Sequence, residues 1–392
     1  MPREGGARQR ALVTGLAWTT ALGTDPASVW DRLLAGQTGI REVHSDHPLR
    51  SLLAAPVAAP GPDGGTPRQR QHRITVDTAA RALADAGVPA DAPGLRLILG
   101  TSLGPHFDEP SPVEDAPLSD WADDAARALG AVNPPWSVTT ACSSGSDAVL
   151  LGLELIASGG AELCLCGGVD VLTPAKRLGH SVLGTMTSTS LRAFDQEHDG
   201  TVLGEGSGFL VLESARSARA RGVRAHGVVS GAASTNDASG LTAPDPGGAT
   251  AAAAVQQALR ASGRRPEDVL VVNAHGSGTV RNDEAEALAL TRALGDGPLV
   301  FATKGAFGHT LGATGAIEAI TVLLALRSGL VPAVVGLRKP AADCARLRLV
   351  ADRPAPLDRT RPAVGLSLTL AFGGFNTCLV LEEAPHDGID SD

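Results

Sequence analysis

Short apolar runs of strand length alternate with alanine- and leucine-rich segments of helix length along most of the chain. This alternation predicts an α/β fold, in which layers of helices pack on a sheet. Aromatic residues make up only 3% of the 392 residues and tyrosine is absent, so the core has to consist mainly of Ala, Val and Leu. Such small aliphatic side chains suit the close packing of helices on a sheet.

The alternation of strands and helices occurs twice. In residues 1–225 and again in residues 226–392, a strand runs through small residues into a long apolar helix. The first of these turns carries Cys142 and the second carries His309. Because 392 residues exceed what one compact core usually holds, we expect two domains, or two halves of one layered domain, that meet at residues 225 and 226. The two similar turns hint at an internal duplication.

The pattern predicts particular elements and two irregular segments. Asp25 is expected to cap a helix, whereas residues 43–72 and 104–120 are rich in Pro, Gly or acidic residues and are expected to form surface loops. The acidic end of the chain, from Asp387 to Asp392, is expected to be loose. The expected strands are 11–16, 95–99, 163–170, 227–230, 269–273, 299–302 and two within 364–382, and the main expected helices are 74–87, 214–221, 248–261, 283–293 and 312–328.

Charge and cysteine content exclude several classes of protein. The net charge is -9 and no basic stripe stands out, which disfavours binding to nucleic acid or to a membrane surface. We expect no membrane-spanning run and no signal peptide, and five cysteines without framework spacing indicate a reducing, cytoplasmic location. Cys164 and Cys166 share a face of a strand without a second ligand pair, so no metal site is expected.

Cys142 lies where a β-branched run turns through small residues into an apolar helix. A thiol at a helix N-terminus meets free N–H groups and partial positive charge, which favour the thiolate. The small neighbours leave room for a reactant at the sulfur. A buried structural cysteine remains the alternative interpretation of this residue on its own.

Two further strand ends carry polar residues among small ones. His275 follows the strand 269–273, and Lys304 and His309 follow the strand 299–302. Since sites gather at the carboxyl ends of strands in α/β sheets, these residues and Cys142 are expected to converge on one cavity. A nucleophilic thiol with two donors for a developing oxyanion indicates acyl transfer through a thioester.

These segments, in this order, resemble the β-ketoacyl synthase family of the thiolase superfamily, in its elongating and type II polyketide branches. The resemblance covers nearly the whole chain. It rests on the nucleophile motif Thr140-Ala-Cys-Ser-Ser-Gly145, the histidine motif Asn273-Ala-His-Gly-Ser-Gly-Thr279 with Asn282-Asp283-x-x-Glu286, the lysine–histidine motif Lys304-Gly-x-x-Gly-His-Thr-x-Gly-Ala313, and the segments 194–213, 372–376, 13–16 and 33–40.

The resemblance implies a thiolase-like five-layer αβαβα fold and a decarboxylative Claisen condensation. By this analogy Cys142 takes an acyl chain from a phosphopantetheine thioester on an acyl carrier protein or CoA. His275 and His309 then stabilise the enolate formed from a malonyl-type extender. The backbone N–H groups of Cys142 and Phe372 form the oxyanion hole. A homodimer is implied, with a heterodimer containing a second ketosynthase-like subunit as the other possibility, and no permanently bound cofactor.

The same analogy assigns supporting roles. Lys304, in a chain with only three lysines, orders its neighbours with help from Glu318. Ser277 and Thr279 bind the pantetheine arm, and Phe372 also gates the acyl pocket. The carrier protein, being acidic, is expected to dock on arginines.

The chain departs from the family pattern in several places. The loop 104–136 is shorter than in elongating members, Ala371 and Ser277 replace a usual glycine and threonine, and His198-Asp-Gly-Thr201 replaces an Arg-Asp-Gly-aromatic pattern. These changes concern substrate shape, chain length and partner more than reaction class. Two other functions stay open: cysteine-dependent acyl transfer to a non-carbanion acceptor, and a partner subunit resembling a chain-length factor. A polyketide or specialised fatty-acyl pathway is expected.

Overall fold

The computed structural model describes residues 10–58, 65–109 and 115–384. Within them, eleven strands form one mixed sheet in the order β12-β10-β9-β14-β15-β8-β1-β7-β6-β4-β5. The strands of the first half are β1 (Ala11–Thr19), β4 (Leu95–Gly100), β5 (Trp136–Val138), β6 (Leu163–Asp170) and β7 (Gly206–Ser214). Those of the second half are β8 (Gly227–Asn236), β9 (Val269–Asn273), β10 (Leu299–Phe301), β14 (Val364–Leu370) and β15 (Phe375–Glu382), with β12 (Arg348–Leu349) at the edge.

The two halves have the same strand order. From the outer edge inwards, the order is β5-β4-β6-β7-β1 in the first half and, leaving out β12, β10-β9-β14-β15-β8 in the second. When the strands of each half are numbered along the chain, both orders are third, second, fourth, fifth, first. The first strands of the halves, β1 and β8, join the two groups through a short antiparallel ladder of three residue pairs. This repeated topology confirms the expected thiolase-like duplication, while the boundary at residues 225 and 226 itself stays a prediction.

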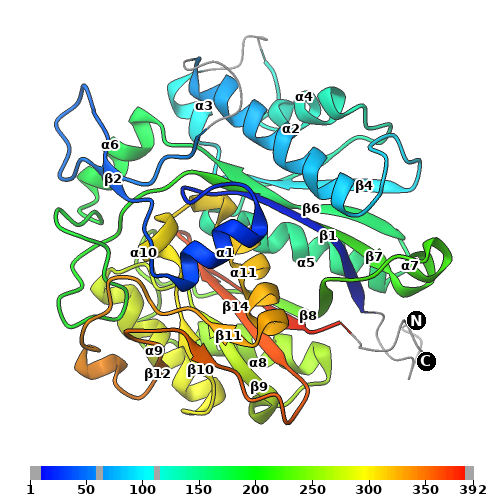
Figure 1. The fold of residues 1–392 in the computed structure, drawn as a ribbon. Coiled ribbons are helices and arrows are strands. Elements are labelled where there is room, and N and C mark those ends of the chain that lie inside the picture. Colours follow the sequence, from blue (N-terminus) through cyan, green and yellow to red (C-terminus); the bar gives the residue numbers. More distant parts are fainter. Residues whose placement is uncertain (1–9, 59–64, 110–114, 385–392) are drawn as a thin grey trace.

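Helices lie between and outside the two groups of strands (Figure 1). The central layer consists of α5 (Ser144–Ala157) and α11 (Thr314–Ser328), each of which packs on strands of both halves. Outside the first half, α2 (Pro67–Asp85) packs on β1, β6 and β7, with α4 (Asp120–Leu129) against it. Outside the second half, α8 (Ala249–Ser262) packs on β8 and β15, with α9 (Val280–Leu294) against it. The result is the αβαβα order of layers.

Smaller elements complete the described part of the chain. They are the helices α1 (Pro26–Leu34), α3 (Gly104–Asp108), α6 (Pro174–Val182), α7 (Ala215–Arg221) and α10 (Lys304–Phe307), and the short strands β2 (Arg41–Glu42), β3 (Leu53–Ala54), β11 (Leu330–Val331) and β13 (Ala355–Pro356). Asp25 caps α1 as expected, because its carboxylate accepts a hydrogen bond from the Ser28 N–H at 2.8 Å.

The two central helices begin alike and touch closely. A one-turn 3₁₀ segment precedes each of them, and its first residue, Ala141 or Leu311, has a φ of 52°. A Cβ added to Gly145 would lie 2.8 Å from the Gly312 carbonyl oxygen. The missing side chain therefore lets the start of α5 approach the backbone that leads into α11.

The helix of Leu311–Ser328 corrects one expectation. It is long and apolar enough to cross a membrane, whereas no such run was expected from the sequence. Within the fold, 89% of it is buried. It is therefore apolar on all sides because it lies in the central layer between the two groups of strands.

Several element boundaries also differ from those expected. The helix expected at 74–87 begins already at Pro67, where Thr66 and Gln69 form a capping box. Its polar first turns hide the apolar period, so the expected surface loop 43–72 is wrong over its last residues. The expected loop 104–120 contains α3. Parts of both loops, and the acidic end from Asp387, lie outside the described residues.

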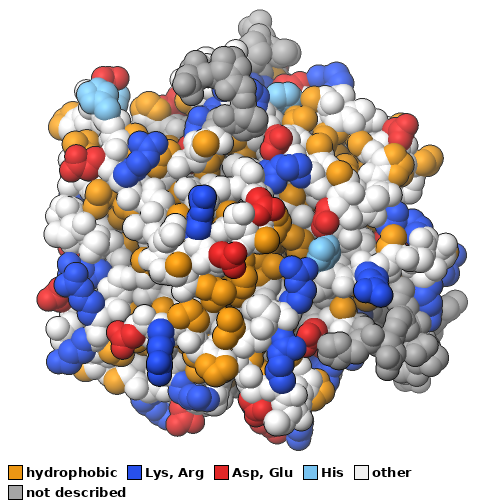
Figure 2. Space-filling view, viewed as in Figure 1, with side chains coloured by type: hydrophobic (Ala, Val, Ile, Leu, Met, Phe, Trp, Pro, Cys, Tyr) orange, Lys and Arg blue, Asp and Glu red, His pale blue; other side chains and the backbone are white. Residues whose placement is uncertain are grey.

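Surface charge is mixed on the face shown in Figure 2, where Lys and Arg side chains alternate with Asp and Glu and form no continuous basic stripe. All five cysteines are free and buried. Cys164 and Cys166 lie fully buried in β6, and no group of three His, Cys, Asp or Glu side chains suited to a metal ion occurs among the described residues.

Candidate active site

Cys142 lies in the 3₁₀ turn between β5 and α5, with 4% of its surface exposed. It borders a cavity of about 410 Å³. Asp147, one helical turn further on, fixes this turn by accepting hydrogen bonds from the hydroxyl groups of Thr140 (2.5 Å), Ser143 (2.9 Å) and Thr377 (2.6 Å). The buried Asp147 carboxylate, which accepts three hydrogen bonds, thus fixes the turn that places the sulfur at the cavity.

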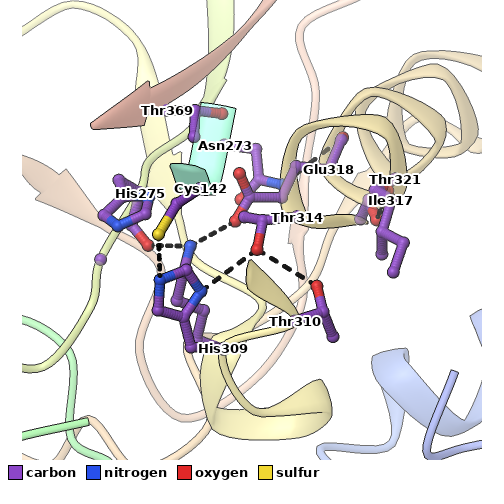
Figure 3. A network of polar contacts seen from close by, with 12 residues as sticks. Cys142, Asn273, His275, His309, Thr310, Thr314, Ile317, Glu318, Thr321 and Thr369 are labelled. Atoms are coloured by element: carbon purple, nitrogen blue, oxygen red, sulfur yellow. Dashed lines mark hydrogen bonds and ion pairs between the residues drawn. The ribbon is translucent and has the colours of Figure 1, made fainter. Parts of the chain in front are cut away.

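His309 lies directly beside the sulfur, and Figure 3 shows the side chains of Cys142, His275 and His309 close together. Its Nε2 is 3.1 Å from Cys142 Sγ. Its Nδ1 lies 3.1 Å from Thr314 Oγ1 and accepts a hydrogen bond from the Leu311 backbone N–H at 3.4 Å. Because a backbone N–H can only donate, the ring proton of a neutral His309 belongs on Nε2, which can donate into the cavity.

His275 supplies the second imidazole. Its ring centroid lies 5.2 Å from that of His309, edge to face at 86°. The backbone N–H groups of His275 and Gly276 donate to the Glu286 carboxylate at 2.6 and 2.8 Å, which fixes the loop after β9. Burial, followed by the nearby charge of Lys304, lowers the pKa of both histidines well below the usual range. Both rings are therefore neutral, and each carries one ring N–H that is able to donate a hydrogen bond.

Lys304 and Glu318 lie behind the cavity, each 1% exposed. Lys304 Nζ donates to Glu318 Oε1 at 2.6 Å and also to the backbone carbonyl oxygen of His275. Burial raises the pKa of the Glu318 carboxyl to about 7, against the lowering effect of Lys304. The lysine thus connects α10, α11 and the His275 loop. The ordering role that the family resemblance implies for Lys304 stays a prediction.

The remaining expected residues line the same cavity. Ser277 and Thr279 lie on its wall, with their hydroxyl oxygens 2.9 Å apart. Phe372 follows β14 and lines the cavity, and its backbone N–H lowers the pKa of the Cys142 thiol. The structure therefore brings together at one cavity all six of the predicted residues that were expected to meet substrate.

Residues 9–218 match the family model of the β-ketoacyl synthase N-terminal domain, and residues 226–338 match that of the C-terminal domain. The chain belongs to the β-ketoacyl synthase family. It is an acyltransferase-type enzyme whose family chemistry is the condensation of acyl thioesters.

Full-length relatives agree with this membership. The synthase is 34% identical to 3-oxoacyl-[acyl-carrier-protein] synthase 2 of Mycobacterium leprae, over 96% of this chain and 97% of the relative. It is 32% identical to the tetracenomycin polyketide synthase ketoacyl synthase alpha subunit of Streptomyces glaucescens, over 96% and 97%. A solved β-ketoacyl synthase from Burkholderia phymatum has a TM-score of 0.86 at 28% identity, covering 96% and 100% of the two chains.

The protonation state of Cys142 contradicts one expectation. Burial raises the pKa of the thiol to about 11, although Lys304, Lys176 and the Phe372 N–H all lower it. The helix N-terminus was expected to favour the thiolate, but removal of the sulfur from water outweighs this effect. In the resting synthase, the group at His309 is therefore a thiol, which loses its proton only during reaction.

This protonation state predicts how the synthase reacts with an alkylating agent. The rate of Cys142 alkylation by iodoacetamide should rise about tenfold for each unit of pH above neutrality, because only the thiolate reacts. Cys142 should be modified before the other four cysteines, which do not line the cavity. Peptide mapping after timed alkylation measures both. A rate that levels off near neutral pH would contradict the raised pKa.

Glu286 and Asp283 are functional supports to which the sequence assigned no role, although both stand in the histidine motif. Asp283, fully buried in α9, accepts hydrogen bonds from the backbone N–H groups of Phe194 (2.7 Å) and Gly278 (3.2 Å). Their spacing placed them on one face of α9 toward the loop of His275. Asp283 and Glu286 lie three residues apart in a helix segment that is otherwise apolar on the same face. This pattern is the sequence signal that could have indicated their role.

We predict that Glu286→Gln destabilises the synthase by about 1–3 kcal/mol, because one of the two backbone N–H groups then loses its acceptor. Denaturant unfolding measures the change. Glu284→Gln, on the same helix but only half-buried, is the matched control and should stay within about 0.5 kcal/mol of the parent. Equal effects of the two substitutions would contradict the anchoring role.

Proposed function

We propose that Cys142 is the nucleophile and that it takes its acyl chain from a phosphopantetheine thioester. The observation that carries this proposal is the 3.1 Å contact between Cys142 Sγ and His309 Nε2 at the cavity. In this step the sulfur forms a bond to the acyl carbon and the bond to the pantetheine sulfur breaks. The departing thiolate takes up the proton that Cys142 loses, so no other reactant is needed.

Condensation then uses a malonyl-type extender thioester. Its C–C bond to the carboxylate breaks, carbon dioxide leaves, and the electron pair moves to the thioester oxygen as an enolate. His275 and His309, both neutral donors, stabilise this oxyanion. The enolate carbon attacks the Cys142 thioester, and the backbone N–H groups of Cys142 and Phe372 stabilise the tetrahedral oxyanion. Collapse releases a β-ketoacyl thioester and the Cys142 thiolate, which takes a proton from solvent water.

The supporting residues act through position. Lys304 holds the His275 carbonyl and Glu318 together, so that the two imidazoles keep their relative orientation. Ser277 and Thr279, on the cavity wall, would hydrogen-bond the amides of the pantetheine arm. The synthase then needs no bound cofactor of its own, since the reactive groups arrive on phosphopantetheine.

We infer that the acyl chains arrive on an acyl carrier protein in the cytoplasm, in polyketide or specialised fatty-acyl synthesis. The named functions of the Mycobacterium and Streptomyces relatives support this context. We further propose a homodimer. A heterodimer is the other candidate, because the structure titled the ishigamide ketosynthase/chain length factor matches this chain with a TM-score of 0.84 at 31% identity.

Two alternatives are less well supported by the site. A cysteine-dependent transfer to an amine or alcohol would need no enolate stabilisation, yet two neutral imidazoles lie edge to face beside the thiol. A chain-length-factor-like subunit would need no nucleophile, yet Cys142 borders the cavity.

The deciding experiment follows the acyl group in two stages. Intact mass should show one acyl adduct after incubation with acyl-pantetheine thioesters, and addition of malonyl-pantetheine should convert it to a β-ketoacyl product with release of carbon dioxide. An adduct that malonyl thioester leaves in place, but that amines or alcohols discharge, would favour transfer without condensation. No adduct from any donor would contradict a catalytic role for the chain alone.

A further inference from the structure

A buried ion pair beside the site, Asp170 with Lys176, has no role in the reaction described above. Asp170 ends β6 and is fully buried, and Lys176 of α6 is 9% exposed. Lys176 Nζ donates to Asp170 Oδ1 and to the hydroxyl of Ser102, which follows β4. A charged pair is costly to bury unless its other hydrogen-bonding positions are also used. The partners of the second carboxylate oxygen therefore show what the pair holds in place.

The second oxygen of Asp170 binds the backbone that leads into α11. Oδ2 accepts hydrogen bonds from the N–H groups of Gly312 at 2.6 Å and Ser102 at 2.9 Å. Gly312 is the middle residue of the 3₁₀ turn Leu311–Ala313, so the carboxylate of the first half reaches a turn of the second. A Cβ added to Gly312 would lie 2.6 Å from Oδ2, and the missing side chain therefore gives the carboxylate access to this N–H.

This turn determines how His309 is held. The Leu311 N–H donates to His309 Nδ1, and this bond leaves the ring proton on Nε2, beside the sulfur. Leu311 has a φ of 52°, a left-handed conformation that a leucine keeps only when its surroundings hold it there. Asp170 binds the N–H of the next residue, Gly312. The carboxylate therefore stabilises the conformation in which the Leu311 N–H reaches the ring.

The first half repeats this arrangement, with Asp147 in the place of Asp170. The turn of Cys142 also begins with a residue at a φ of 52°, Ala141, and hydrogen bonds to Asp147 hold that turn. One buried carboxylate thus serves each of the two reacting groups.

The charge of Lys176 also reaches the cavity. His180 of α6 lines the cavity and stacks on Phe372. Burial, followed by the charge of Lys176, lowers the pKa of His180 to about 4. Lys176 contributes to the lowered pKa of His309 as well, after burial, Lys304 and His180. The ammonium group therefore favours neutral imidazoles at the site.

We propose that Asp170 is a positioning residue, which holds the turn after His309 so that His309 Nε2 carries its proton toward the sulfur and the enolate. Lys176 balances the charge of this carboxylate. Without Asp170, Leu311 can leave its left-handed conformation, and the ring proton can move to Nδ1, where Thr314 Oγ1 can accept it. Nε2 then still accepts the thiol proton but no longer donates to the enolate. This inference rests on the proposed function and adds a residue to its support.

The test uses two double variants that leave no unpaired buried charge. Asp170→Leu with Lys176→Met removes the acceptor, whereas Asp170→Asn with Lys176→Met keeps a carbonyl oxygen for the Gly312 N–H. Acylation and condensation are measured separately, from acyl- and malonyl-pantetheine. The first variant should condense about 10–100-fold more slowly while acylation changes little, because only the enolate loses a donor. The second variant should recover condensation toward the parent rate.

NMR of protein with isotope-labelled histidine reads the position of the ring proton without any substrate. The spectrum of His309→Gln identifies the signals of His309. In the parent and in the second variant the proton should lie on Nε2, whereas the first variant should show it on Nδ1 in a large fraction of molecules.

Glu213→Gln is the matched control. Glu213 in β7 is also a fully buried carboxylate in an ion pair, with Arg221, but it does not line the cavity. Its substitution should change neither the ratio of the two rates nor the ring proton of His309. An Nε2 proton that persists in the first variant, or equal losses in both double variants, would overturn the inference alone. Absence of adduct and product in the parent would overturn the proposed function, while the NMR comparison would still test the effect of Asp170 on His309.

Discussion

Replacement of Cys142 by alanine should abolish the acyl adduct and lower condensation by at least about a thousandfold, because no other group in the cavity can form the thioester. The fold should persist. The turn around residue 142 is held by Asp147 and three hydroxyl groups, none of which uses the sulfur. Intact mass and product formation from acyl and malonyl thioesters measure the two effects.

The matched control for this variant is Cys378→Ala. Cys378 is buried in β15 and does not line the cavity, so its loss removes a sulfur without removing the nucleophile. That variant should keep both the adduct and the product. Condensation that survives Cys142→Ala undiminished would refute the assignment of the nucleophile.

The second large effect concerns His275. His275→Leu should lower condensation about 10²–10³-fold while the acyl adduct on Cys142 still forms, because only the enolate loses a donor. The loop should keep its place, since Glu286 and Lys304 bind the backbone of residue 275 and not its side chain. Single-turnover acylation and product release, measured separately, give the two rates.

His226→Leu tests whether any loss merely reflects a damaged fold. His226 pairs with Asp85 at 2.8 Å and does not line the cavity, so its loss should spare both rates. If His275→Leu slowed acylation as much as condensation, the histidine would act on the first step, and the division of roles proposed here would be wrong.

The sequence allowed the site to be predicted because its residues follow strand ends. His275 comes two residues after the end of β9, Cys142 lies in the turn after β5, and His309 follows β10 and the short helix α10. The order of these strands in the sheet brings their carboxyl ends together. The family motifs then supplied the roles. The protonation of Cys142 could not be predicted, since it depends on how much water the folded walls exclude.

Other features depend on contacts between distant segments. His180 belongs to none of the motifs quoted above, and only the folded chain places it on Phe372 and Thr185. The apolar length of α11 likewise fits either a membrane-spanning helix or a buried core helix. Only the fold, in which strands of both halves enclose α11, decides between the two. A one-dimensional pattern records the period of a helix but not what covers it.

The contact between the central helices sets the geometry of the site from a distance. Gly315 in α11 lies so near Ser146 of α5 that an added Cβ would fall 1.7 Å from its hydroxyl oxygen. Cys142 precedes one of these helices and His309 the other, so the spacing of the backbones also fixes the distance between sulfur and imidazole. In evolutionary terms, the glycines make the two halves interdependent. Either half can vary its outer face. Larger side chains at the contact between α5 and α11, however, would separate Cys142 from His309.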